Sequence, residues 1–194
     1  MRTGPITKDV STVQLGLSQI RVGLAASYIS NTGAALSESD SLGAMAATSF
    51  TSEKEYHIRE DGYPLTPKPP YAISETNTLG CAFKEITPKT LALSLGMSPA
   101  TFSNPHAGTI PLGGVAPPQP LRVEAVYTFP GSTYQMIIIF PMANITSGLK
   151  LEHQLDTPAA VTLSIKAINA ASNAVGGNAV WDTMPNGKIL FLGG

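Results

Sequence analysis

Histidine, the commonest side chain in acid–base and metal chemistry, occurs three times in this 194-residue chain. His57, His106 and His153 are widely separated, and none has a second ligand at the i, i+4 spacing of a helical metal site. The sequence also lacks the G-x-S-x-G nucleophile elbow, the phosphate-binding P-loop and the dinucleotide fingerprint. We therefore expect neither a metal nor a cofactor.

Carboxylates give the second candidate chemistry. Glu53 and Glu55 have the same parity in one predicted strand, and Glu75 belongs to the next, so a pair of them could perform acid–base work. Lys54 and Lys84 lie nearby in the same predicted sheet, and a charged, water-exposed face explains the cluster better. We expect a protein that is not an enzyme.

Composition restricts the partners. Charged residues make up only 13% of the chain and the net charge is −1, which gives no basic patch for specific nucleic-acid binding. The single cysteine, Cys81, excludes an intramolecular disulfide and fits a reducing compartment. The start of the chain has no apolar run typical of a secretory signal, and the apolar residues 136–140 are too few to span a bilayer. We expect no membrane partner.

The clearest local structure lies in residues 71–97. Residues 71–83 alternate between apolar and small polar side chains, as in a half-buried strand. Thr87 can cap a helix that has Pro88 at its first position, and Gly96 can end it. The pattern predicts a strand followed by one short helix, about residues 87–95. This helix must pack against the rest of the domain, because an isolated helix of two turns is only marginally stable in water.

Alternation also marks the preceding strand. Phe50, Tyr56 and Ile58 share one parity and are expected to face a core. The opposite parity of this strand and of residues 71–83 carries small polar or acidic side chains, expected on a wet face: Thr51, Glu53, Glu55, Ser74, Thr76 and Thr78.

Further strands are expected at 13–24 (with a break near Ser18), 121–129, 134–142, 149–155, 161–167 and 189–192. Residues 1–12 are expected to form an N-terminal arm, 61–70 a stiff proline-rich projecting loop, 98–120 an irregular insertion and 176–194 a C-terminal segment. The terminal strand could pair within the domain or with a neighbour. The sum is one mainly β domain, an antiparallel sandwich or barrel with one flanking helix.

Three stretches resemble the major tail proteins, or tail tube proteins, of long-tailed bacteriophages. They read LGAMAATSFTSEKEY, IREDGYPLTP and YAISETNTLGCAFKEITPKTLALSLG. Their order is a strand, a projecting proline-bearing loop, a strand of alternating small polar residues and a short helix. The resemblance covers residues 13–97 well and 121–168 more loosely.

The resemblance implies a β-sandwich subunit of six-membered rings that stack into a hollow tube, the conduit for DNA ejection. It implies that the loop at 61–70 reaches the adjacent ring, with Asp61, Tyr63, Leu65 and Lys68 as contact residues. The expected partners are copies of itself, then other tail proteins such as the tape measure, terminator and distal tail proteins, with DNA only in transit. The place of action would be the virion tail, after synthesis in the bacterial cytoplasm.

In such a tube, the wet face named above would line the lumen, with Glu124 and Thr128 as weaker candidates. Carboxylates there would repel phosphates over roughly 8 Å at physiological salt. Three other classes stay open: the inner tube of a contractile tail or injection machine, a monomeric β-sandwich module that binds carbohydrate, and a jelly-roll hydrolase. The module would show several exposed aromatics on one face, and the hydrolase a paired acid or a metal cluster. The sequence does not separate contractile from non-contractile tails.

Overall fold

The computed structural model describes residues 16, 18–61, 66–67, 69–98, 107–112, 119–149 and 161–193. The expected N-terminal arm, the tip of the projecting loop, most of the irregular insertion and the strand expected at 149–155 lie outside these residues, apart from their margins. The elements, in chain order, are β1 (Gln19–Leu24), α1 (Ala25–Tyr28), the 3₁₀ turn η2 (Glu38–Asp40), β2 (Met45–His57), β3 (Glu60–Asp61), β4 (Thr66–Pro67), β5 (Tyr71–Phe83), α2 (Pro88–Ser94), β6 (Leu121–Thr128), β7 (Gln135–Ile145), β8 (Val161–Ala167), the 3₁₀ turn η4 (Ala179–Trp181) and β9 (Lys188–Leu192).

One curved antiparallel sheet organises the domain. Its strands follow the order β1-β6-β7-β8-β5-β2, and β9 pairs with β7 beside this path. The sheet is open, although its two end strands approach where the backbone N–H of Ser18 donates to Thr48 Oγ1 at 3.4 Å. The predicted mainly β, antiparallel class is confirmed.

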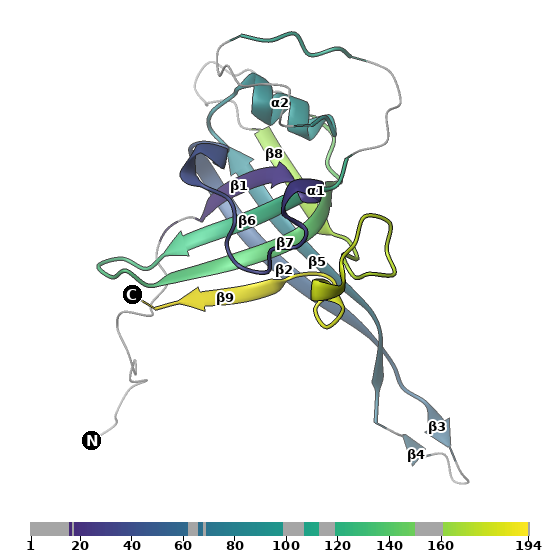
Figure 1. The fold of residues 1–194 in the computed structure, drawn as a ribbon. Coiled ribbons are helices and arrows are strands. Elements are labelled where there is room, and N and C mark those ends of the chain that lie inside the picture. Colours follow the sequence, from purple (N-terminus) through teal and green to yellow (C-terminus); the bar gives the residue numbers. More distant parts are fainter. Residues whose placement is uncertain are drawn as a thin grey trace.

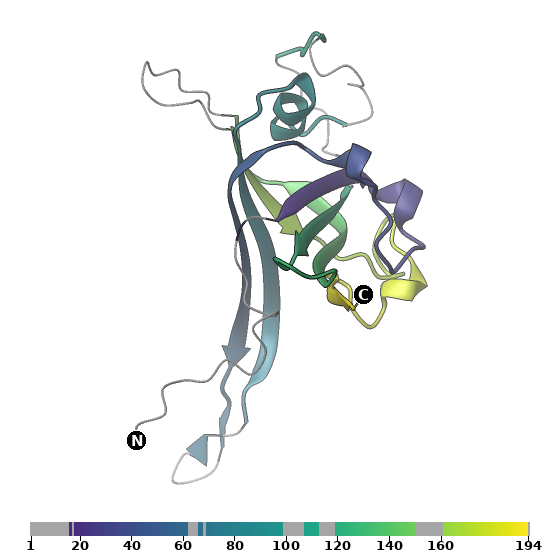
Figure 2. The ribbon, with the colours of Figure 1, turned by 90° about the vertical axis from the view of Figure 1, so that its left-hand side faces the viewer.

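Strands β2 and β5 extend far beyond the other strands as a two-stranded ribbon, with β3 and β4 at its far end (Figures 1 and 2). Each has 13 residues, so each spans about 40 Å. Strand β8 pairs with β5 only from Thr78 to Phe83, which leaves the outer half of the ribbon without a third strand.

The helix predicted at 87–95 is α2. Thr87 Oγ1 accepts from the backbone N–H of Thr90, and Thr90 Oγ1 accepts from that of Thr87, so each threonine caps the other. Pro88 occupies the first turn, and Gly96 takes a φ of +76° just beyond the helix. Leu93 anchors α2 in the main core.

Two apolar clusters lie on opposite sides of β6 and β7. The larger one joins α2, β1, β5 and β8 to residues such as Val123 and Phe140. The smaller one surrounds Trp181, which is fully buried and donates from Nε1 to the backbone carbonyl of Ile29 at 2.7 Å. Strand β7 is therefore covered on both faces, because Ile138 belongs to the first cluster and Ile139 to the second.

Two expectations about burial are wrong. The side chains expected to face a core from β2 and just beyond it, Phe50, Tyr56 and Ile58, are 37%, 55% and 58% exposed, because the sheet has no second layer over the ribbon. Strand β6 was expected to have a wet face, yet all its residues except Thr128 are buried. The loop after α1 and the C-terminal segment cover it, and sequence parity does not reveal such coverage.

Candidate assembly surface

The six residues expected on one wet face do lie together. In the β2–β5 ladder Thr51 pairs with Thr78, Glu53 with Thr76 and Glu55 with Ser74. Directly opposed residues share a face of an antiparallel sheet, so we call this set the polar face. Its β2 members and Ser74 are exposed, while Thr76 and Thr78 are half-buried. That it lines a lumen stays a prediction.

The polar face continues onto β8. Thr78 pairs with Lys166, Gly80 with Ser164 and Ala82 with Thr162. The alternate residues of both strands, such as Cys81 and Leu163, are buried in the main core. The three strands therefore form a wall with one dry side and one side of small polar groups. Gly80 leaves room for the side chain of Ser49, which it opposes in the ladder, because a Cβ there would lie 2.6 Å from Ser49 Oγ.

Charges on the two faces of the ribbon are separated. On the polar face, Ser74 Oγ donates to Glu55 Oε2 at 3.1 Å. On the other face, Lys54 Nζ lies 3.4 Å from Glu75 Oε2. A hydrogen bond from Asn77, followed by the charge of Lys54, lowers the pKa of the Glu75 carboxyl, although burial opposes this. The Lys54 side chain therefore lies on the face opposite the polar face, and it does not neutralise the charge of Glu53 or Glu55.

Glu124 does not belong to the polar face, and its place among the weaker lumen candidates was wrong. It is fully buried, with Oε1 2.7 Å from Arg122 Nε. Its carboxylate accepts from the backbone N–H groups of Ala35 and Leu36, while Arg122 donates to the carbonyls of Tyr28, Asn31 and Gly33. The pair holds the loop after α1 against β6. The parity of the strand could not reveal this, because the partners are about 90 residues away in the sequence.

The other face of the ribbon is apolar and uncovered. Ile73 in β5, which alternates with Ser74 of the polar face, is 57% exposed on this other face. Beyond it a β-bulge shifts the register, so that Tyr56 pairs with Ala72 and the exposed Tyr71 with His57, which puts Tyr56 and Tyr71 on opposite faces of the ribbon. The ribbon also has open edges, because β2 ends the strand order and β5 has no second neighbour before Thr78. A two-stranded ribbon is marginal in water, and unpaired edges are ready to accept another strand. These features indicate a surface that is completed by another molecule.

The expected contact residues of the projecting loop are only partly described. Asp61 lies in β3, where it pairs with Thr66 of β4 at the far end of the ribbon. Tyr63, Leu65 and Lys68 lie outside the described residues, and their contact role stays a prediction.

Residues suited to chemistry are dispersed in the part of the chain that the structure describes. No group of three or more His, Cys, Asp or Glu side chains there could hold a metal ion. His57 makes an edge contact with the Tyr71 ring at 5.4 Å. Cys81 is buried, and burial raises the pKa of its thiol to about 12, which makes it inert at neutral pH. None of the described helices is long and apolar enough to cross a membrane.

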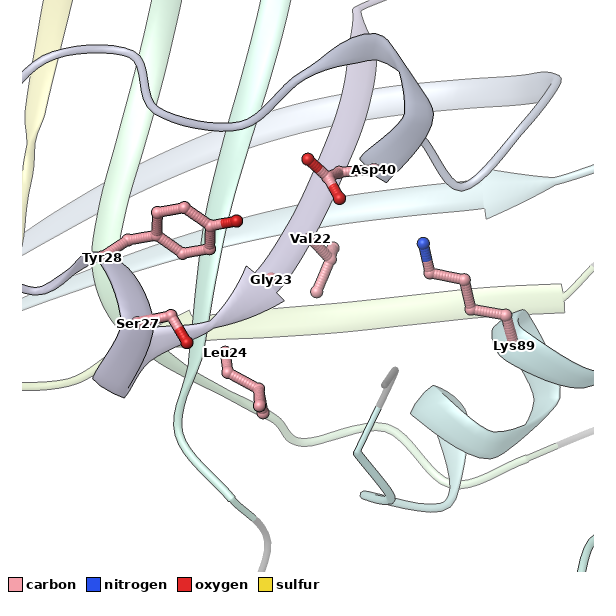
Figure 3. A pocket seen from close by; sticks show the side chains of 7 residues that line it. All are labelled: Val22, Gly23, Leu24, Ser27, Tyr28, Asp40 and Lys89. Atoms are coloured by element: carbon pink, nitrogen blue, oxygen red, sulfur yellow. The ribbon is translucent and has the colours of Figure 1, made fainter. Parts of the chain in front are cut away.

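A small cavity of about 210 Å³ lies between α1, η2 and α2 (Figure 3). Asp40 and Lys89 reach it from different elements, with Ser27 and Tyr28 on a third side. Burial lowers the pKa of the Lys89 ammonium, and the charge of Asp40 opposes that shift. Asp40 Oδ2 already accepts from the backbone N–H of Ser37 at 2.9 Å. The cavity is smaller than the roughly 300–1,000 Å³ of typical ligand sites, and we assign it no ligand.

Comparison with known proteins gives similarity at the level of structure alone. No protein-family model and no curated protein matches the sequence. The fold is similar to a chain in the virion of a native gene transfer agent particle, with 12% identity, a TM-score of 0.44 and coverage of 81% of this chain and 96% of that one. It is also similar to a chain in the tail of an empty gene transfer agent particle with C6 symmetry (11% identity, TM-score 0.46, 84% and 100% coverage). A third is from the tube-terminating cap of the anti-feeding prophage (10% identity, TM-score 0.42, 97% and 99% coverage).

These solved structures come from a virion, a tail and a tube-terminating cap. At such identities and TM-scores the likeness concerns the general course of the chain. It assigns no activity, partner or assembly state to this protein.

Proposed function

We propose that this chain is a structural subunit of a bacteriophage-type tail tube, in which copies join side by side so that their polar faces surround a water-filled channel. The observation that carries the proposal is the two-sided ribbon formed by β2 and β5. One face is polar and made of small side chains, while the other face and both edges are left open. A single chain does not complete this surface, but an array of copies can.

The polar face suits a channel wall. Glu53 and Glu55 would repel phosphate groups at short range, whereas Thr51, Thr76 and Thr78 offer hydroxyls without charge. Lys166, which pairs with Thr78, adds a single positive charge within the paired part of this face. Nucleic acid could therefore pass without the clustered cationic contacts that hold phosphates.

The apolar face of the ribbon suits a protein contact. The ribbon carries exposed apolar side chains such as Ile73, and patches of such side chains mark interfaces. A chain with only 13% charged residues also fits a subunit whose surface is largely covered by copies of itself. The order of elements that resembles tail tube proteins supports the same interpretation.

In more detail, we propose that six copies form each ring and that the rings stack into a tube within the virion tail. DNA would move through this tube during ejection. The loop at 61–70, at the far end of the ribbon, would contact the next ring. Tape measure, terminator and distal tail proteins would be the further partners.

Negative-stain electron microscopy of the purified chain tests the proposal, together with a matched pair of variants in β5. Ile73→Ser changes an exposed apolar contact and should abolish rings or tubes while leaving a folded monomer. Thr76→Ser changes the polar face and should leave assembly intact. A wild-type chain that stays monomeric at high concentration, or an Ile73→Ser variant that assembles normally, would contradict the proposal.

A further inference from the structure

The turn that leads into β9 contains the only Asn-Gly pair of the chain, Asn186-Gly187. Such a pair is prone to deamidation in an unfolded chain, because glycine has no side chain to hinder ring closure. The Gly187 nitrogen loses its proton to hydroxide and bonds to Cγ of Asn186, and Nδ2 takes a proton from water and leaves as ammonia. Water then opens the cyclic imide. Cleavage of the new bond gives aspartate, and cleavage of the original peptide bond gives isoaspartate.

The folded turn opposes this ring closure. The N–H of Gly187 donates to the carbonyl of Met184 at 3.0 Å, so Pro185 and Asn186 are the two central residues of the turn. No described residue other than glycine has a positive φ, which makes this a type I turn with the ψ of Asn186 near about 0°. At that ψ the Gly187 nitrogen is rotated away from the Asn186 side chain, whereas the ring needs the two nearly eclipsed. The attacking nitrogen is therefore hydrogen-bonded and misplaced.

Neighbouring segments hold the turn in this conformation. The carbonyl of Pro185 accepts from the backbone N–H of Ala170 at 2.9 Å. Gly187 lies so close to the next strand that a Cβ on it would collide with the carbonyl oxygen of Ile139. Directly after it, Lys188 pairs with Ile139, and β9 continues along β7 (Figure 1). Rotation of the peptide before Gly187 therefore requires the start of β9 to leave β7.

We propose that Asn186 is a deamidation site that the pairing of β9 with β7 keeps closed and that release of β9 opens. Where β9 opens and closes faster than the amide reacts, the rate follows the fraction of molecules with β9 released. Asn186 and Glu75 line the same cavity of about 320 Å³, so aspartate adds a second carboxylate there. Isoaspartate lengthens the backbone by one methylene just before β9. Both products disfavour the return of β9, and the inference does not depend on assembly into a tube.

Incubation of the full-length chain at mildly alkaline pH, with and without guanidinium chloride, tests the proposal. Peptide mapping by mass spectrometry measures the exchange of the side-chain NH₂ for OH at each asparagine. In denaturant, Asn186 should react fastest, and the folded chain should react there at least roughly tenfold more slowly. Asn186→Gln should remove the product, because the longer side chain would have to close a larger ring.

A matched pair of variants shows which opening matters. Leu190→Ala truncates a half-buried β9 side chain that packs against the smaller cluster, and it should speed deamidation of the folded chain several-fold. Leu91→Ala truncates an equally half-buried side chain of α2 on the larger cluster and should leave the rate unchanged. Equal rates in the folded and denatured chains, equal acceleration by the two variants, or another asparagine that reacts first in denaturant would overturn the inference.

Discussion

Glu53 of β2 and Thr76 of β5 lie directly opposite each other, on the face of the sheet that points away from the core. Their neighbours one residue along each strand belong to the other face, where Lys54 pairs with Glu75. The ribbon therefore keeps uncharged hydroxyls and the carboxylates of Glu53 and Glu55 on one side, and its Lys54–Glu75 salt bridge on the other. The two strands thus separate a polar face from a face that carries apolar groups.

The first prediction concerns the polar face. Thr76→Lys should change the free energy of unfolding by no more than about 0.5 kcal/mol, because the side chain lies on a wet face and meets Glu53 across the ladder. Leu163→Ala, on the dry side of β8, should cost about 2–5 kcal/mol. Urea denaturation of both variants checks the contrast, and a Thr76→Lys variant as unstable as Leu163→Ala would show that this face is not wet.

The second prediction concerns the buried pair. Arg122→Met should destabilise the fold by about 3–5 kcal/mol, because it leaves the Glu124 carboxylate buried without its partner. The Arg122→Met, Glu124→Leu double variant should not regain wild-type stability, since the loop groups that the pair satisfies would still lack partners. Denaturation and amide exchange at Ala35 and Leu36 measure both effects. Full recovery in the double variant would mean that the loop does not depend on the pair.

The third prediction compares two turn glycines. Gly187 has a φ of +116°, and a Cβ there would lie 2.1 Å from the carbonyl oxygen of Ile139. Gly187→Ala should therefore cost more than about 2 kcal/mol and loosen β9 from β7. Gly131 has a φ of +72° with nothing within 4 Å of a Cβ, so Gly131→Ala should cost only about 1 kcal/mol. Thermal unfolding of the two variants separates the effect of backbone strain, which both share, from the steric clash of the added Cβ, which only Gly187→Ala has. Equal losses of unfolding free energy in the two variants would contradict the close approach at Gly187.

The fourth prediction is a pH dependence at Cys81. Burial raises the pKa of its thiol from 9.0 to about 12, so the folded state holds the proton more tightly than the unfolded state. The contribution to stability is fully present below pH 9 and is lost as the pH rises from there toward 12, by up to about 1.4 kcal/mol per pH unit. Comparison with Cys81→Ala isolates this slope in alkaline denaturation. Identical slopes, or rapid labelling of the native thiol at pH 8, would contradict the burial.

Local signals explain what the sequence predicted well. The helix α2 could be placed because Thr87, Pro88 and Gly96 act within a few residues of one another. The polar face could be placed because strand parity is a local property, and β2 and β5 have regular alternation on that side.

The misses involve contacts between distant segments. Strand parity predicts that Glu124 faces solvent. It is buried because the loop near Leu36, which is distant in the sequence, packs over it. Phe50 is predicted from the sequence to be a core residue, yet it stays 37% exposed although its ring packs against Phe140, because no second layer covers the ribbon. The partner of β9 was left open by its apolar sequence, and the structure pairs it with β7.

A cryo-electron-microscopy reconstruction of the assembled protein tests the central claim most directly. The account predicts a hollow tube in which Glu53 and Thr76 face the channel while Ile73 is covered by neighbouring copies. A particle with Glu53 and Thr76 on its exterior, or a preparation that contains only monomers, would contradict it.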